Sequence, residues 1–448
     1  MSNTMKENKM GTMPVNKLLI NMALPMMISM LVQALYNIVD SIFVARISEE
    51  ALTAVSMAFP MQNLMIGVAG GVGVGTNALL SRALGEGRHE EADKMAVQGI
   101  FITACSYIIF LVIGLFFARE FFVIQGANEV IADYGYDYLS VILIISFGCL
   151  FQMIFERLLQ ATGRTFYSMI TQGTGAIINI ILDPILIFVF NMGVAGAAIA
   201  TVISQIASAI WTVGFLLSKK ATYTIKLRHM IRLNSRRIKK ILSLGLAGFT
   251  MLATNAAVQM VCNMTLKQYG SDLYIGIMTI ITSVRDILVL PVQGFSQGAQ
   301  PVLGYNYGAE KNGRVKKAIK YMSVILISYT VLAWMTVAVF PQFFIRIFTE
   351  NADLLAGGVP ALHIYFFGFF FMALQFCAQT VFTALDKPKQ AVFFSMFRKI
   401  IIVVPMTVLL PIFWTPHVNG VFWAEPISNL IGGAAAFTTM ILTVYKKL

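Results

Sequence analysis

Apolar runs of about twenty residues or longer recur along the whole chain, separated by short polar segments, and they limit the folds open to it. A helix rises about 1.5 Å per residue, so a run of this length can cross the hydrocarbon core of a membrane. Hydrophobic residues make up 58% of the 448 residues and charged residues only 12%, which is about half of the charged fraction of a soluble domain. The sequence therefore predicts an all-α integral membrane protein.

Charged segments and Gly- or Pro-rich breaks divide these runs into twelve expected transmembrane helices. The first follows a polar stretch that lacks the short apolar core and cleavage site of a signal peptide, so we expect it to be retained. The expected helices cover residues 17–45, 52–82, 93–118, 131–160, 165–190, 193–218, 238–266, 271–303, 316–340, 356–384, 389–412 and 418–444.

Lys and Arg are distributed unevenly between the two sides of this arrangement. When the N-terminus is placed in the cytoplasm, 26 of the 33 Lys and Arg residues fall on the cytoplasmic side, as the positive-inside rule requires. We therefore expect a multi-pass protein of the cell (inner or plasma) membrane, with both termini cytoplasmic. We also expect it to contact membrane lipid and to be a monomer. The same distribution explains the net charge of +12 without a nucleic-acid partner.

The longest polar stretch, residues 218–240, lies midway along the chain and separates two sets of six expected helices. Because each half holds an even number of spans, a repeat between them would be parallel, and we expect two pseudo-symmetric six-helix lobes around a central cavity. The expected units are a cytoplasmic tail (1–16), an N-lobe (17–218), a basic cytoplasmic linker (219–237) and a C-lobe (238–448). With a shift of about 223 residues, and a four-residue insertion before the last pair, the repeat aligns Gly75-Thr76-Asn77 with Gly298-Ala299-Gln300, Gly85 with Gly308, and Gly193-Val194 with Gly420-Val421.

Four polar side chains are predicted to meet near the outer side of the first lobe. Asp40 lies on the first span, Asn179 and Asp183 lie one turn apart on the fifth, and Thr201 lies on the sixth. Counted from the outer ends of their helices, Asp40, Asp183 and Thr201 lie at one depth, roughly 7–12 Å below the surface. Their oxygens suit a small hard cation or a shared proton, and Pro184 offers a hinge beside them.

We therefore predict a cation-coupling site for H⁺ or Na⁺, in which these four residues are the metal ligands if the ion is Na⁺. The alternative is that the two carboxylates only hydrogen-bond to neighbouring helices. In the repeat, the position that matches Asp40 is Cys262, and the one that matches Asp183 is Leu410. We expect the ion-coupling site in the first lobe only.

Five further residues are candidates for the wall of a substrate cavity. Glu156 on the fourth span is placed to contact a cationic ligand, or to form an ion pair near the loop with Arg157. Asp286 on the eighth span either lines the cavity or pairs with a neighbour, as does the adjacent Arg285. The other three candidates are uncharged: Asn37, Gln259 and Gln375.

Enzymatic chemistry is not expected, because no nucleophile with a base and no metal cluster stands out. No GxxxxGK[ST] motif is present, so ATP drive is not supported. We expect no cofactor. The four cysteines lie widely separated inside apolar runs, and no CxxC motif occurs; they are Cys105, Cys149, Cys262 and Cys377.

These motifs together resemble the multidrug and toxic compound extrusion (MATE) family, of the multidrug/oligosaccharidyl-lipid/polysaccharide flippase superfamily. The likeness extends over nearly the full length of the chain. It is carried by Pro25, Leu35-Tyr36-Asn37-Ile38-Val39-Asp40-Ser41-Ile42-Phe43-Val44, residues 71–87, Asn179 with Asp183-Pro184, residues 193–201, Gln297-Gly298-Ala299-Gln300-Pro301 and Gly304-Tyr305-Asn306-Tyr307-Gly308.

The resemblance implies a twelve-helix fold of two lobes, alternating access, and export of small amphipathic organic cations driven by inward H⁺ or Na⁺. It also implies that a cation site is formed by the residues that match Asp40, Asn179, Asp183 and Thr201. Some branches of the family carry further acidic residues in the seventh and tenth spans. This chain has uncharged residues there, which disfavours a sodium site in the second lobe; they are Asn255, Gln259 and Gln375.

Two other classes of transport protein remain as alternatives. A lipid-linked oligosaccharide flippase or another lipid flippase of the same superfamily would share the two lobes, but would need a strongly cationic cavity for pyrophosphate. Arg285 and Arg398 are the arginines available inside the expected spans of the second lobe. A passive channel would need neither the paired acids nor the repeat.

Overall fold

The computed structural model describes residues 8–218 and 233–448, and this part of the chain is built from helices joined by short loops. The predicted linker therefore falls mostly outside the described residues, as does the beginning of the predicted N-terminal tail. The first half contains α1 (Lys9–Thr12), α2 (Val15–Ala45), α3 (Glu49–Gly85), α4 (His89–Phe116), α5 (Ala118–Ile124), α6 (Glu129–Ile144), α7 (Phe147–Ala161), α8 (Thr165–Pro184), η1 (Ile185–Val189) and α9 (Gly193–Leu217). The second half contains α10 (Ser235–Tyr269), α11 (Asp272–Gly308), α12 (Asn312–Val339), α13 (Pro341–Arg346), α14 (Ala352–Phe366), α15 (Phe371–Ala384), α16 (Pro388–Met396), η3 (Phe397–Val403), α17 (Val404–Phe413), α18 (His417–Thr443) and η4 (Tyr445–Lys447).

Within the described ranges, ten helices are long and apolar enough to cross a membrane. Two further spans are bent pairs: α6 and α7 meet at 45°, and α14 and α15 meet at 49°. Counting each pair as one span gives twelve, so the predicted all-α, twelve-span membrane fold is confirmed. The bends fall in the fourth and tenth spans, which are equivalent positions in the two halves. In the tenth span the bend includes Gly368, whose φ of 69° is accessible to glycine without strain.

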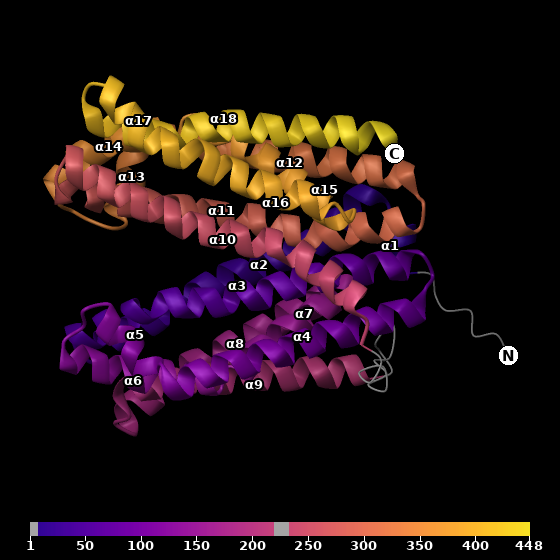
Figure 1. Ribbon diagram of the computed structural model, residues 1–448, viewed down its shortest axis with the longest axis horizontal. Helices are drawn as coiled ribbons and strands as arrows, with labels where there is room; N and C mark the ends of the chain where they lie inside the picture. The colour runs from indigo at the N-terminus through magenta and orange to yellow at the C-terminus, as the bar shows by residue number, and fades with distance from the viewer. Residues whose placement is uncertain (1–7, 219–232) are drawn as a thin grey trace.

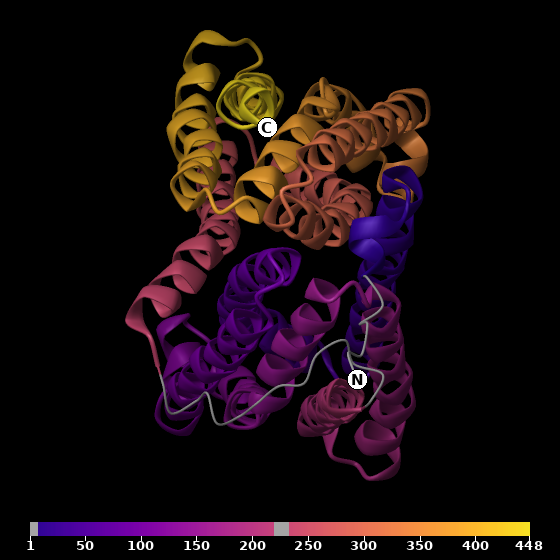
Figure 2. The ribbon, with the colours of Figure 1, turned by 90° about the vertical axis from the view of Figure 1, so that its right-hand side faces the viewer.

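The helices gather into two bundles, one for each half of the chain (Figure 1). The view along the bundles shows that the beginning of α2 lies against the helices of the second half (Figure 2). Accordingly, Val15, Leu18 and Leu19 belong to the apolar core of the second bundle. In the same way, Ile241 and Leu244 of α10 belong to an apolar core of the first bundle. Each lobe is thus completed by the first turns of a helix from the other lobe.

Glycines allow the backbones of the two lobes to approach closely. A Cβ atom at Gly71 of α3 would lie 2.9 Å from the carbonyl oxygen of Gly245 of α10. A Cβ atom at Gly298 of α11 would lie 2.5 Å from Cα of Ala23 of α2. Small residues let membrane helices pack at such distances and so gain dispersion energy. The glycine-rich segments that suggested the repeat therefore form the interface between the lobes.

Two ion pairs and a hydrogen bond join the lobes at the end of the molecule where α1 and the C-terminus lie, here called the terminal end (Figure 1). Arg82 Nη1 of α3 lies 3.2 Å from Asp386 Oδ2, which follows α15. Arg237 Nη2 of α10 lies 2.9 Å from Glu91 Oε2 of α4. Arg314 Nη2 of α12 donates to the carbonyl oxygen of Met13 at 2.7 Å. These contacts hold the two lobes together at the terminal end.

Candidate functional site

The four residues predicted to form a cation site come together inside the first lobe. Asn179 and Asp183 are both buried on α8, and the Asn179 amide donates to Asp183 Oδ1 at 3.1 Å. The same amide donates to the Thr201 hydroxyl of α9 at 3.3 Å. The carboxyl group of Asp40, on α2, interacts with that of Asp183. Three helices therefore converge on one polar group inside the lobe.

This group has more acceptors than donors. Asp40 Oδ1, Asn179 Oδ1 and Asp183 Oδ2 are all buried, and none receives a hydrogen bond from the described part of the chain. Buried polar atoms in folded proteins nearly always have a partner. Two carboxylates can hydrogen-bond to each other only when one of them carries a proton. A proton or a small cation would satisfy these oxygens, since both interact with carboxylate and amide oxygens.

The helix changes its geometry directly beside this group. Pro184 ends α8, and the next turn is the π-helix η1, in which the Phe190 amide donates to the carbonyl oxygen of Ile185 at 3.0 Å. Proline removes one backbone hydrogen bond and disfavours a straight continuation, and π-helical turns often occur at functional sites. Pro184 remains a predicted hinge, and it lies where a small change in helix angle would move Asp183.

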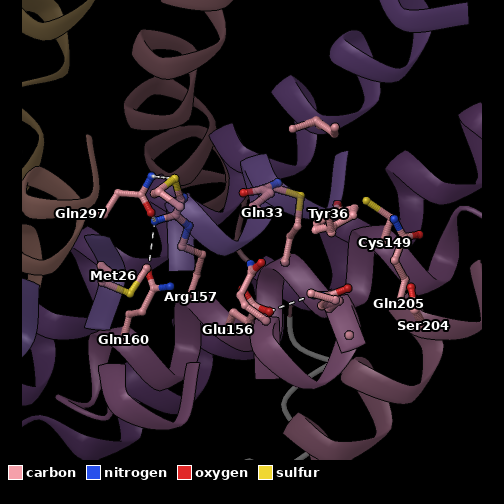
Figure 3. Close-up of a pocket in the computed structure, with 17 residues that line it drawn as sticks. Met26, Gln33, Tyr36, Cys149, Glu156, Arg157, Gln160, Ser204, Gln205 and Gln297 are labelled. Carbon is pink, nitrogen blue, oxygen red and sulfur yellow. Dashed lines mark hydrogen bonds between the residues drawn. The ribbon is translucent and has the colours of Figure 1, made fainter. Parts of the chain in front are cut away.

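The first lobe also contains a cavity, whose lining residues Figure 3 shows. It encloses about 780 Å³, including space open to solvent, and α2, α3, α7, α8 and α9 form its wall together with Gln297 of α11. Glu156 of α7 lines it and is only 4% exposed. Gln152 Nε2 donates to Glu156 Oε1 at 3.0 Å, and Gln172 Nε2 donates to Glu156 Oε2 at 2.7 Å. Neutral donors thus hold a buried carboxylate at the cavity wall.

Arg157 does not form the ion pair with Glu156 that was one of the two sequence interpretations. Its Nη1 donates instead to Gln160 Oε1 and to Gln297 Oε1, each at 3.1 Å, as Figure 3 shows. Because Gln297 belongs to α11, this contact links the cavity wall to the other lobe.

The remaining cavity candidates lie outside this cavity. Asn37 is exposed on α2. Asp286 is exposed and pairs with Arg285, whose Nη2 lies 2.7 Å from Asp286 Oδ1. Gln259 lines a separate pocket in the second lobe. Gln375 is buried and donates to the carbonyl oxygen of Phe394 at 3.3 Å.

Sequence reasoning missed most of the neutral cavity wall. Single glutamines and methionines in apolar spans carry no motif, so only their helical spacing could have placed them on one face. The missed neutral residues with polar or sulfur-containing side chains are Met26, Met30, Gln33, Tyr36, Cys149, Gln152, Met153, Gln160, Gln172, Ser204, Gln205 and Gln297.

Sequence reasoning also missed an ionic cluster in the second lobe, although it noted cationic residues in these spans. Arg398 and Lys399 are adjacent on the π-helix η3, and both are buried. Lys399 Nζ lies 3.1 Å from Glu425 Oε1 of α18, and Arg398 Nη1 lies 2.9 Å from the same oxygen. The two adjacent cationic residues in an apolar span could have predicted this cluster, because each buried cation needs a buried partner.

Comparison with known proteins agrees with this architecture. The MatE family model matches residues 25–185 and 247–409. The multidrug export protein MepA of Staphylococcus aureus (strain MSSA476) is 24% identical over 432 residues, covering 96% of this chain and 94% of that protein. The FAD transporter of Shewanella oneidensis is 24% identical over 428 residues, covering 95% of this chain and 94% of that protein. A solved outward-facing structure of a multidrug resistance MATE family transporter of the MOP superfamily has a TM-score of 0.92 at 23% identity, covering 99% of each chain.

Proposed function

Because the chain belongs to the MatE family of membrane transporters, which are not enzymes, we propose that it expels amphipathic organic cations by antiport with H⁺ or Na⁺. The observation that carries this proposal is the pair of Asp40 and Asp183: Oδ1 of Asp40 and Oδ2 of Asp183 are buried and have no donor in the described chain. An ion that binds between these carboxylates changes their net charge, and this change can shift the helices that carry them, α2 and α8. The name of MepA, a multidrug export protein, supports efflux as the direction of transport.

The cavity suits a cation with an apolar body. Glu156 supplies a negative charge that two glutamine amides hold in place without neutralising it. Met26, Met30 and Tyr36 line the same cavity. Thioether and aromatic groups adapt to ligands of different shape, and aromatic faces attract cations. This combination accounts for broad selectivity among organic cations.

Ion binding and drug release are coupled because each favours one of two arrangements of the lobes. A cation that enters from outside removes one negative charge from the pair of Asp40 and Asp183. α2 and α8 then shift, with Pro184 as the hinge of α8, and the bound drug loses affinity and leaves outward. Release of the ion on the inner side resets the cycle. The contacts between the lobes at the terminal end support a state that is closed at that end. With both termini cytoplasmic, as the Lys and Arg distribution supports, this state faces outward.

We further propose that the protein acts as a monomer in the cell membrane, contacts only lipid and its small-molecule cargo, and needs no cofactor besides the coupling ion. Two parallel lobes of one chain can enclose a central pathway without a second copy.

The proposal is tested by loading proteoliposomes with a fluorescent organic cation and imposing a pH gradient or a sodium gradient separately. Wild type, Asp40→Asn and Asp183→Asn are compared with Asp353→Asn, which changes an exposed carboxylate on α14. We expect one gradient to drive export in wild type and in the control, and both site variants to lose it. Equal export by all four proteins would refute the coupling site.

A lipid flippase of the same superfamily is distinguished in the same vesicles. It would show no gradient-driven movement of the organic cation and would instead move a labelled lipid between the leaflets. Such a result would replace the antiport proposal.

A further inference from the structure

A groove runs between α3 and α10, where the two lobes meet. It has a free volume of about 320 Å³, and all of its described lining residues belong to these two helices. Its apolar side chains are Val68, Val72, Leu242, Leu246 and Phe249. Figure 2 shows α10 and the beginning of α2 on opposite sides of the molecule. The groove therefore lies at a lateral edge of the lobe interface, apart from the cavity around Glu156.

The groove can accept an apolar chain. Gly71 and Gly245 contribute no side chain to it, so the space stays open. The exposed fractions of Leu242 and Leu246 are 46% and 49%, so the groove opens to the surroundings of the protein. Ser243 carries the one polar side chain of the described wall, and its hydroxyl already donates to the carbonyl oxygen of Lys240 at 3.0 Å.

Two cationic side chains continue this face of α10 toward the terminal end. Lys239 lies three and four residues before Leu242 and Ser243, and Arg236 lies three residues before Lys239. Residues at this spacing share one face of a helix. The apolar groove and the two cations therefore form one continuous stripe.

The charges of these two side chains are not neutralised by the protein. Arg236 and Lys239 are exposed, and neither forms an ion pair with a described residue. Their neighbours on the other faces of α10 differ, because Arg237 and Lys240 both pair with carboxylates. A ligand seated in the groove thus meets two available cations at one end.

The length of the stripe matches one leaflet of a membrane. Ten residues separate Lys239 from Phe249, which corresponds to about 15 Å along a helix. The hydrocarbon core is about 30 Å thick, so one leaflet supplies about half of that thickness. With both termini cytoplasmic, as proposed above, this is the inner leaflet.

We propose that the groove binds an anionic glycerophospholipid of this leaflet, with its phosphate against Arg236 and Lys239 and one acyl chain between α3 and α10. Charge selects this occupant, because basic groups between helices on the cytoplasmic side attract anionic headgroups, whereas the headgroup of a phosphatidylcholine carries a cation of its own. The bound lipid contacts both lobes, since α3 belongs to the first and α10 to the second. The site does not depend on the export of cations.

Binding is measured by native mass spectrometry of the full chain, which is delipidated in detergent and titrated separately with dioleoylphosphatidylglycerol and dioleoylphosphatidylcholine. These probes share their acyl chains and differ in headgroup charge. We expect the first lipid to bind wild type more tightly when it is the phosphatidylglycerol. The double variant Arg236→Gln with Lys239→Gln should weaken that binding about tenfold or more, because each basic residue contributes roughly fivefold.

The matched control is Lys317→Gln with Lys320→Gln, which removes two exposed lysines at the same spacing on α12 and should leave the affinity unchanged. Ser243→Phe keeps both cations but places a ring in the groove, so it should also weaken phosphatidylglycerol binding. Equal affinity of wild type for the two lipids, or equal weakening by the two double variants, would overturn the proposal. Unchanged binding by Ser243→Phe would overturn it as well, because the lipid would then be held by surface charge alone.

Discussion

The two lobes share one architecture but carry opposite polar groups. In the first lobe, Asp40 and Asp183 face each other, and Oδ1 of Asp40 and Oδ2 of Asp183 are buried without a donor in the described chain. In the second lobe, Arg398 and Lys399 share the single carboxylate of Glu425. The first lobe thus contains buried acceptors without donors, and the second contains a buried donor, Arg398 Nε, without an acceptor in the described chain. A parallel repeat can therefore diverge in chemistry while its helix packing is retained.

The two lobes also differ in what holds their polar groups in place. Neutral amides surround the carboxylates of the first lobe: Asn179 contacts Asp183, and Gln152 and Gln172 contact Glu156. Amides keep a carboxylate in position while leaving its charge free to respond to an ion or ligand. The second lobe uses direct ion pairs, which are difficult to change without loss of stability. We infer that the first lobe responds to ions and that the ionic cluster of the second lobe is more rigid.

The largest expected effect is on the stability of the second lobe. Glu425→Gln leaves Arg398 and Lys399 buried without their counter-charge, and it should lower the free energy of unfolding by about 3–5 kcal/mol. Thermal unfolding in detergent measures this change, with Asp353→Asn as the exposed control. The double variant Lys399→Met with Glu425→Gln should recover part of the loss. An unchanged melting temperature for Glu425→Gln would show that the second lobe is no more rigidly paired than the first.

The next effect concerns ligand affinity in the first lobe. Glu156→Gln keeps the size of the side chain but removes its charge, so binding of an organic cation should weaken by about 1.5–3 kcal/mol, the range for a hydrogen bond to a charged group. Equilibrium binding of a fluorescent cation measures the change. A neutral molecule of similar shape serves as the control, because its affinity should not change. Equal losses for both ligands would mean that Glu156 shapes the cavity and does not attract charge.

At the coupling site we expect a smaller effect, and it is a gain in stability. Asp183→Asn removes one of two facing carboxylates and supplies an amide donor for Asp40, so it should raise the free energy of unfolding by about 1 kcal/mol. Thermal unfolding at neutral pH without added sodium measures it, and the same variant should not be stabilised further by sodium. A clear loss of stability in Asp183→Asn would mean that the pair is structural, like the cluster of Glu425.

The sequence predicted the membrane fold and the placement of the first-lobe residues because both follow from periodic or local rules. Runs of apolar residues have a minimum length set by membrane thickness, and Asn179 and Asp183 meet because residues four apart share a helix face. The pairing of Lys399 with Glu425 depends on which helices become neighbours and on the π-helical turn η3, and neither is encoded locally. The close approach of Gly71 to Gly245 likewise could not be predicted, because it depends on how α3 and α10 pack together.

The smallest effect tests a difference between two equivalent loops. Gly163 in the first lobe and Asp386 in the second both have positive φ, 84° and 58°. Asp386 also pairs with Arg82 and Lys240 at 3.2 and 3.3 Å. Asparagine tolerates this backbone conformation, so Asp386→Asn removes the charge without straining the loop.

Only the pair with Arg82 crosses between the lobes. A partly exposed ion pair contributes about 0.2–1 kcal/mol, so Asp386→Asn should shift the balance between closed and open terminal ends about 1.4- to fivefold toward open. Spin labels attached after His89→Cys and Lys389→Cys, in a chain whose exposed Cys105 is replaced, report the distance between the lobes there. Asp353→Asn in the same labelled chain is the control. If the distance distribution does not change, the glycine interface and the other polar contacts hold this end closed, and Asp386 has no more effect on gating than the uncharged Gly163 at the matching position of the first lobe.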